Sequence, residues 1–280
     1  MQERNNFIIV ACNSFQYFRK KISMEYAIVK VPAAPVRRKA RHQGEMTNQL
    51  LFGDTVKVLK QKGDKWIKVR GLSDGYEGWI SKLLLDEVSE KEAKAGIISA
   101  NVAAEPINTV LINQLPMQIP LGASLPALEG SQGKINGLVY QFNGKSINRS
   151  EIKPDSSSIK QLVAPWINAP YMWGGKTVFG VDCSGFVQVN FKMLGIDLPR
   201  DAWQQAQEGK IVDKLKEAQA GDLAFFDDHD EIVHVGILLS NDTIIHASGK
   251  VRIDRIDKKG IVNSDTGKRT HALRVIKRYW

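Results

Sequence analysis

The pattern of the sequence changes near residue 150, and this change constrains the fold more than any other feature. Before it, short segments of alternating apolar and polar residues are separated by Gly-Asp and Ser-Asp-Gly turns, as in small β-domains. After it, helical segments come first and strand-like segments follow, which is typical of an α+β domain. A chain of 280 residues with 43% hydrophobic residues can form two or three cores. We therefore expect a multidomain protein, all-β at its N-terminal end and α+β in residues 150–280.

The first β-domain is predicted over residues 26–86. TVKVLK at Thr55–Lys60 and KWIKVR at Lys65–Arg70 alternate in polarity, and YEGWI at Tyr76–Ile80 adds a further strand. Closely spaced hairpins with aromatic residues at their ends predict a small, half-open β-barrel. Residues 27–85 resemble a bacterial SH3-like domain, in which a "GD.V.VL" strand is followed by "W.KV" and "GW(I/V)".

A second β-domain is predicted over residues 96–149, after a charged linker or short helix at Glu87–Ala95. Its strand-like segments suggest a divergent SH3-like barrel, although Pro116, Pro120 and Pro126 interrupt them. It is not an evident repeat of the first domain.

Residues 1–25 are interpreted as a tail or an upstream extension, with Met24 as the alternative start of translation. FIIVAC at Phe7–Cys12 ends in a cysteine, like a bacterial lipoprotein cleavage box, but its apolar run is shorter than the core of a signal peptide. The cytoplasm is therefore the expected location, with the cell envelope as the alternative if residues 1–12 act as a signal. No apolar run reaches the length of a membrane span.

The net charge of +9 predicts a solvated basic surface rather than a nucleic-acid site. Lysine and arginine are scattered along the chain, apart from the cluster Arg37–Arg41, and no nucleic-acid-binding motif accompanies them. The two cysteines, Cys12 and Cys183, have neither a disulfide pattern nor zinc-ligand spacing. We expect no metal, no cofactor and no nucleic-acid partner, and a monomeric protein.

Cys183 lies where a helix is predicted to begin. Asp182 is suited to the N-cap, apolar residues recur with helical spacing from Phe186 to Leu194, and Gly195 is suited to the C-cap. The exposed N–H groups and the dipole of a helix start favour a thiolate, so we expect a lowered pKa and a nucleophilic sulfur. The alternative is a small buried hydrophobic residue.

Two histidines are predicted to lie close together in space. His234 begins HVGILL and His246 lies in TIIHAS, and the turn Ser240–Asp242 would join the two segments as antiparallel strands. A cysteine nucleophile needs a base, and the base needs a residue that orients it. His234 as base and His246 as orienting residue meet this requirement, with packed core histidines as the alternative.

The order of these motifs resembles that of the NlpC-type cysteine peptidases of bacterial cell walls, which are papain-like. The motifs are YMWGG, DCSGFV, GDLAFF, HVGIL and IIHAS, over residues 155–255. The resemblance implies that Cys183 is the nucleophile, His234 the general base and His246 the third catalytic residue. It further implies that the hydroxyl of Tyr171 lies beside the oxyanion site, with the backbone N–H of Cys183 as the other donor.

The combination with SH3-like domains narrows the resemblance to γ-D-glutamyl-L-diamino acid endopeptidases. It implies hydrolysis of the γ-D-glutamyl–diamino acid amide in murein peptides with a free N-terminal L-Ala, which releases L-Ala-γ-D-Glu for recycling or during remodelling. Glu45 and Tyr76 are placed at the amine by this resemblance, because an ammonium removed from water must be paired. A surface acid and a core tyrosine are the alternatives.

Five further residues are assigned to the substrate side of the site: Trp173, Asp182, Ser184, Arg200 and Asp201. Asp201 is expected to join Glu45 at the amine, whereas Arg200 has a second interpretation, that it holds the local fold. Ala202 and Trp203 stand where the family often has small hydroxyl residues, so this sequence departs from the family pattern at a polar substrate contact. A non-catalytic module that binds cell-wall peptides and a papain-like amidase or acyltransferase remain as alternative functions.

Overall fold

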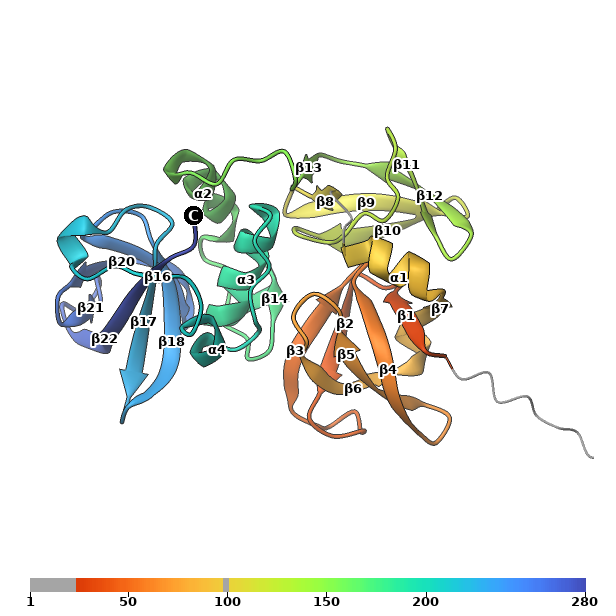
Figure 1. Cartoon of the computed structure of the whole chain (residues 1–280), viewed down its shortest axis with the longest axis horizontal. Coiled ribbons are helices and arrows are strands. Elements are labelled where there is room, and N and C mark those ends of the chain that lie inside the picture. Colours follow the sequence, from red (N-terminus) through yellow and green to blue (C-terminus); the bar gives the residue numbers. More distant parts are fainter. Residues whose placement is uncertain (1–23, 98–100) are drawn as a thin grey trace, which may run out of the picture.

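The computed structural model describes residues 24–97 and 101–280, which form two β-domains and a C-terminal α+β domain (Figure 1). The signal-like segment Phe7–Cys12 lies outside the described residues. Within the described part of the chain, no helix has both the length and the apolar character needed to cross a membrane.

The first β-domain is a seven-stranded antiparallel sheet with the order β3-β2-β6-β5-β4-β1-β7. Its strands are β1 (Tyr26–Val29), β2 (Ala33–Arg37), β3 (Met46–Leu51), β4 (Thr55–Lys62), β5 (Trp66–Gly71), β6 (Glu77–Ser81) and β7 (Leu85–Val88), with the short helix η1 (Lys82–Leu84) before β7. The polarity of β5 alternates as the sequence predicted, because Ile67 and Val69 enter a separate small core inside this domain.

The second β-domain follows the helix α1 (Glu90–Ile97), which begins at a capping box formed by Ser89 and Glu92. Its strands are β8 (Asn101–Ala103), β9 (Ile107–Ile112), β10 (Leu115–Pro120), β11 (Gln132–Ile135), β12 (Leu138–Asn143) and β13 (Ser146–Asn148). Pro116 and Pro120 lie within β10, at the edge of the four-stranded sheet β10-β9-β12-β11. An edge strand tolerates proline because one side of its backbone has no strand partner.

The C-terminal domain combines helices with a seven-stranded sheet of order β16-β22-β17-β18-β19-β20-β21. Its helices are α2 (Ser156–Val163), η2 (Ala164–Trp166), α3 (Cys183–Met193), α4 (Ala202–Gln205) and η3 (Leu215–Glu217). Its strands are β14 (Lys176–Thr177), β15 (Gly180–Val181), β16 (Lys210–Ile211), β17 (Leu223–Asp228), β18 (Glu231–Leu238), β19 (Thr243–Ser248), β20 (Lys250–Asp257), β21 (Gly260–Val262) and β22 (Arg269–Arg278). Because β21 also pairs with β22, the last six strands close into a barrel.

Two features of this domain differ from the sequence prediction. The sequence predicts a helix over Ser157–Ile167, but α2 ends at Val163 and the chain continues as a 3₁₀ turn, because Pro165 has no N–H to donate to the preceding turn. The strands β20 and β21 were not predicted, although KVRIDRID in β20 alternates in polarity. Helices α3 and α4 pack against β18 and lie between the barrel and the first β-domain (Figure 1).

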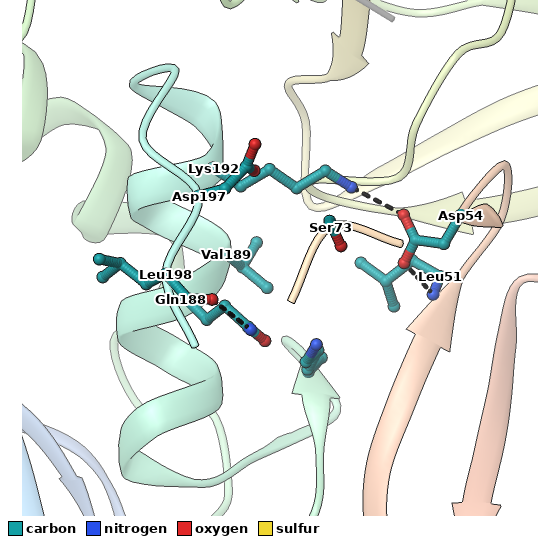
Figure 2. Close-up of a pocket in the computed structure, with 9 residues that line it drawn as sticks. Leu51, Asp54, Ser73, Gln188, Val189, Lys192, Asp197 and Leu198 are labelled. Atoms are coloured by element: carbon teal, nitrogen blue, oxygen red, sulfur yellow. Dashed lines mark hydrogen bonds and ion pairs between the residues drawn. The ribbon is translucent and has the colours of Figure 1, made fainter. Parts of the chain in front are cut away.

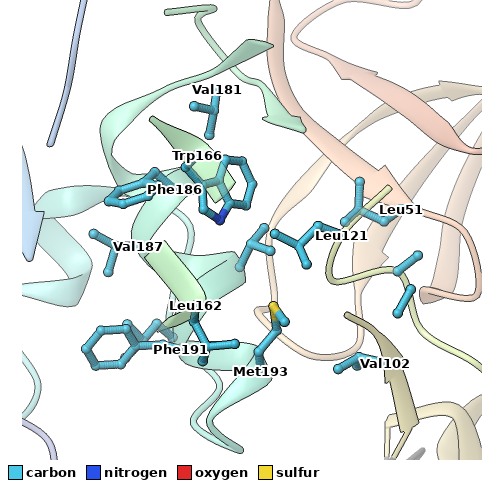
Figure 3. Packing of buried hydrophobic residues seen from close by; sticks show 14 of the residues in the cluster. Leu51, Val102, Leu121, Leu162, Trp166, Val181, Phe186, Val187, Phe191 and Met193 are labelled. Atoms are coloured by element: carbon cyan, nitrogen blue, oxygen red, sulfur yellow. The ribbon is translucent and has the colours of Figure 1, made fainter. Parts of the chain in front are cut away.

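One hydrophobic core joins the three domains. Leu51 of the first β-domain, Leu121 of the second and Met193 of α3 belong to the same buried cluster (Figure 3). At the edge of this cluster, Nζ of Lys192 donates to Oδ1 of Asp54 at 2.9 Å and to Oγ of Ser124 at 2.8 Å. Figure 2 shows Lys192 reaching across from α3 to Asp54. Shared packing and this junction give the domains a defined relative position, which matters for a cleft between them.

Candidate active site

Cys183 is the first residue of α3, at the position that the sequence predicted. Asp182 caps the helix, since its side chain accepts a hydrogen bond from the N–H of Gly185 at 2.7 Å. The sulfur is buried, with Cys183 6% exposed, and it receives a hydrogen bond from the backbone N–H of Val235, the residue that follows His234. The helix and the strand that carries the imidazole thus meet at the thiol.

The expected lowering of the thiol pKa is wrong. Burial raises the pKa of Cys183 to about 11, and the carboxylate of Asp182 adds to this effect. The N–H groups of Ser184 and Val235 and the charge of Arg200 act in the opposite direction, but they do not outweigh burial. A helix start therefore favours the thiolate here, as expected, while the loss of hydration decides the resting protonation state.

We predict that alkylation of Cys183 by iodoacetamide is slow at pH 7 and accelerates about tenfold per pH unit up to pH 10, because only the thiolate reacts. The measurement is the second-order rate constant of alkylation between pH 5 and 10, followed by mass spectrometry of the peptide containing residue 183. A rate constant that does not change between pH 5 and 8 would contradict this, since it would indicate a thiolate–imidazolium pair already present in the free protein.

His234 and His246 lie within hydrogen-bond distance, as their predicted strands required. In the antiparallel pair β18–β19, Gly236 is opposite His246, and Nε2 of His234 is 2.9 Å from Nδ1 of His246. A side chain at Gly236 would meet the Cβ of His246 at 2.9 Å, so glycine permits this close approach. Burial lowers the pKa of His234 well below its usual range, and the neighbouring His246 and His271 contribute. His234 is therefore neutral at pH 7 and able to accept a proton.

Asp254 on β20 completes this arrangement, and the sequence analysis missed it. Its Oδ2 lies 3.0 Å from Nε2 of His246, and both side chains are 1% exposed. Burial acts to raise the pKa of Asp254, but hydrogen bonds from Arg252, from the N–H of Ser264 and from His246 hold it well below its usual range. The only signal in the sequence was the alternation of KVRIDRID, which puts an acidic residue on a strand next to TIIHAS.

An ionised Asp254 determines the tautomers of both imidazoles. A carboxylate only accepts hydrogen bonds, so Nε2 of His246 carries a proton. Burial lowers the pKa of this ring to about 4, so the ring is neutral and its Nδ1 has no proton. Nδ1 of His246 then accepts from Nε2–H of His234. The remaining ring nitrogen of His234, Nδ1, is left with a free lone pair, which is the form that a general base requires.

His271 of β22 is a second residue without a predicted role that lies at this site. Its ring stacks on that of His234 with a centroid distance of 4.3 Å and an interplanar angle of 24°. Burial lowers the pKa of His271, so a neutral ring covers one face of the imidazole of His234. No signal in the sequence connects the two, because the contact depends on the barrel strands.

Tyr171 lies close enough to the thiol for their charges to interact. Burial raises the pKa of its hydroxyl to about 12, and negative charge at Cys183 and Asp182 contributes. The hydroxyl is therefore protonated at neutral pH and can donate a hydrogen bond.

The thiol opens into a cleft of about 680 Å³ that the first β-domain and the C-terminal domain share. The lining residues come from both domains: Arg38, Glu45, Thr47, Lys68, Tyr76, Glu77, Gly78, Trp79, Trp173, Asp182, Cys183, Ser184, Arg200, Asp201, Ala202, Trp203, Ile232 and Val233. The cleft thus brings together every residue assigned to the substrate side from the sequence.

Three of these residues, Arg200, Asp182 and Ser184, form hydrogen bonds with one another. The buried guanidinium of Arg200 donates to Asp182, to Oγ of Ser184 and to Oδ1 of Asn48 in the first β-domain. This geometry favours the second interpretation of Arg200, namely that it holds the local fold. Asp182 also accepts from the N–H of Gly174, so its carboxylate has little remaining capacity for a ligand.

The lining of the cleft also includes acidic groups. Oε1 of Glu45 accepts from Nε1 of Trp173 at 3.1 Å, which is a contact between the two domains. Burial raises the pKa of Asp201, although the charge of Arg200 opposes this shift. Burial also raises the pKa of Tyr76, whose hydroxyl is hydrogen-bonded to the side chain of Thr47.

The carboxylate of Asp201 caps α4, where it accepts from the backbone N–H of Gln204, and it also accepts a hydrogen bond from the side chain of Trp203. The ion pairs found among the described residues do not include Asp201, so the charge of this half-buried carboxylate has no cationic partner within ion-pair distance.

Comparison with known proteins identifies two domains in the chain. Residues 168–270 match the NlpC/P60 family, and residues 36–82 match the bacterial dipeptidyl-peptidase Sh3 domain. The chain is 30% identical over 212 residues to a gamma-D-glutamyl-L-lysine dipeptidyl-peptidase of Bacillus subtilis, with 71% of each chain covered. It is 28% identical over 260 residues to a protein of the same name from Bacillus cereus, which covers 81% of this chain and 75% of that protein.

The fold has a counterpart among solved structures. A crystal structure of an NlpC/P60 family protein from Bacillus cereus superposes with a TM-score of 0.74 at 22% identity, and it covers 91% of this chain and 99% of that chain. The likeness therefore extends over both β-domains as well as the C-terminal domain.

Proposed function

Because this chain belongs to the NlpC/P60 family and is a peptidase, we propose that it hydrolyses the γ-D-glutamyl–diamino acid amide in murein peptides that carry a free N-terminal L-alanine. The observation that carries the proposal is the chain of hydrogen bonds from Asp254 through His246 to His234, beside a cysteine at a helix start. The names of the two Bacillus relatives support the choice of bond.

The first chemical step forms a thioester. Nδ1 of His234 accepts the proton of the Cys183 thiol as the sulfur attacks the γ-carbonyl carbon of D-glutamate. The resulting oxyanion is stabilised by the hydroxyl of Tyr171 and the N–H of Cys183, and each such donor typically contributes about 2.7–4 kcal/mol. The imidazolium then donates its proton to the amine of the diamino acid, which leaves as the C–N bond breaks.

The second step releases the dipeptide. Water attacks the thioester carbon while His234 accepts one of its protons, and the carbon–sulfur bond breaks to return the thiol and L-Ala-γ-D-Glu. His246 and Asp254 hold the ring of His234 throughout and stabilise its positive charge.

Selection of a free amine follows from the charges of the cleft. Three of its cations are paired with carboxylates, in the pairs Arg38–Glu45, Lys68–Glu77 and Arg200–Asp182. Asp201 is the lining carboxylate whose charge a substrate ammonium would neutralise; Tyr76 lies close enough to interact with this charge, and Glu45 lines the same cleft. Because the first β-domain supplies part of the lining of this cleft, we infer that short released peptides are preferred to intact cell wall, in keeping with recycling in the cytoplasm.

We predict that acetylation of the N-terminal amine lowers kcat/KM for L-Ala-γ-D-Glu-diaminopimelate by about 10²-fold, because a half-buried carboxylate loses its cation. The measurement is mass spectrometry of the products from the free and the acetylated peptide. Equal cleavage of the two peptides contradicts amine selection, while binding of the free peptide without any product indicates a binding module instead.

A further inference from the structure

The turn Ser73–Gly75 carries Tyr76 to the edge of the cleft, and one carboxylate shapes it. Oδ1 of Asp74 accepts a hydrogen bond from the N–H of Tyr76 at 3.0 Å, and the carbonyl of Tyr76 accepts from the N–H of Gly71 at 2.9 Å. The backbone on both sides of the Tyr76 side chain is therefore held by the turn. Asp74 itself does not line the cleft.

The other oxygen of this carboxylate binds the C-terminal domain. Oδ2 of Asp74 accepts from Nε2 of Gln188 at 3.1 Å and lies 3.6 Å from Nζ of Lys176. The side chains of Asp74 and Lys176 are 3% and 8% exposed, so this ion pair is buried between the domains. Gln188 lies on α3, the helix that begins with Cys183, and Figure 2 shows it facing the small cavity beside Ser73.

Asp74 thus connects two parts of the site that are far apart in the sequence. One oxygen sets the backbone of Tyr76, and the other is bonded to the helix of the nucleophile. Loss of the carboxylate charge would leave the ammonium of Lys176 buried without its partner, which is costly, and would free the turn from α3. This contact therefore ties the wall of the cleft at Tyr76 to the helix that carries the thiol.

We propose that Asp74 is a positioning residue for substrate selection, which holds Tyr76 and the wall of the first β-domain in place against the nucleophile helix through Gln188 and Lys176. This inference rests on the proposed preference for peptides with a free amine. It predicts that Asp74 affects discrimination between peptides much more than it affects the chemical step.

The test compares kcat and KM for the free and the N-acetylated peptide in the full-length protein. Asp74→Asn replaces the oxygen that accepts from Nε2 of Gln188 with an NH₂ group, so two donors face each other and the hydrogen bond is lost. We therefore expect the ratio of kcat/KM for free over acetylated peptide to fall at least about tenfold. The fall should come from a higher KM for the free peptide, with kcat changed less than about threefold. The matched control is Asp86→Asn, which removes the ion pair with Lys30 in the same domain and should leave the ratio unchanged.

A second variant tests the contact even if Asp74→Asn folds poorly. Gln188→Leu, which leaves Asp74 and its ion pair intact, should lower selectivity without a large loss of kcat. If Asp74→Asn or Gln188→Leu folds and keeps the wild-type ratio of kcat/KM for free over acetylated peptide, the role proposed for Asp74 is wrong, but amine selection stands. If the wild-type protein cuts both peptides equally, both the role of Asp74 and amine selection are wrong.

Discussion

Replacement of Cys183 by alanine is expected to lower kcat by at least about 10⁴-fold, because the thioester can no longer form and only binding and oxyanion stabilisation remain. Cys183 is small and buried at the first turn of α3, where alanine fits without a clash, so the thermal unfolding midpoint should change little. The measurement is single-turnover hydrolysis of the free peptide, together with a thermal melt of both proteins.

The matched control for this variant is Val187→Ala, on the same helix. Val187 is fully buried in the shared hydrophobic core and does not line the cleft, so its truncation should lower the unfolding midpoint while kcat stays near the wild-type value. The pair of variants separates chemistry from packing. Substantial turnover by Cys183→Ala would remove the assignment of the nucleophile, whatever its stability.

Replacement of Asp254 by asparagine is expected to lower kcat by about 10²- to 10⁴-fold at neutral pH, by analogy with other triads in which the wrong imidazole tautomer is stabilised. An amide can donate to Nε2 of His246, which would reverse both hydrogen bonds and place a proton on the nitrogen of His234 that must accept one. The loss should shrink as pH rises toward the thiol pKa of about 11, since a thiolate needs no base.

This pH dependence distinguishes tautomer control from a merely structural role. A protein weakened by the loss of Asp254 would be impaired at every pH and would show a lower unfolding midpoint, whereas tautomer control is relieved by alkali. Asp257→Asn is the control on the same strand, because Asp257 pairs with Arg269 at the surface and does not contact the imidazoles. Full activity of Asp254→Asn at pH 7 would show that His246 alone orients the base.

Local signals in the sequence predicted the elements that carry the nucleophile and the base. Asp182 as N-cap, the apolar spacing of α3 and Gly195 after it are all properties of adjacent residues, and α3 extends over Cys183–Met193. The turn Ser240–Asp242 predicted a hairpin, and with it the approach of His234 to His246. Pro165 is a local signal for the 3₁₀ end of α2, and the predicted helix over Ser157–Ile167 extends beyond it.

Non-local contacts account for what the sequence did not reveal. His271 and Asp254 reach the imidazoles because the barrel closes and because β20 pairs with β19, and no periodicity within a segment encodes such pairings. The same limit explains the wrong pKa direction for Cys183. A helix start is a local property, but burial depends on everything that packs around the sulfur.

The sequence alone determined the order of the domains, the helix that starts at Cys183 and the hairpin of the two histidines, because capping, turns and apolar spacing act over a few neighbouring residues. Only the tertiary structure decided the protonation state of the thiol, the tautomers set by Asp254 and the wall of the cleft held through Asp74. Those properties depend on desolvation and on hydrogen bonds between residues up to 114 positions apart, which exist only once the domains have packed together.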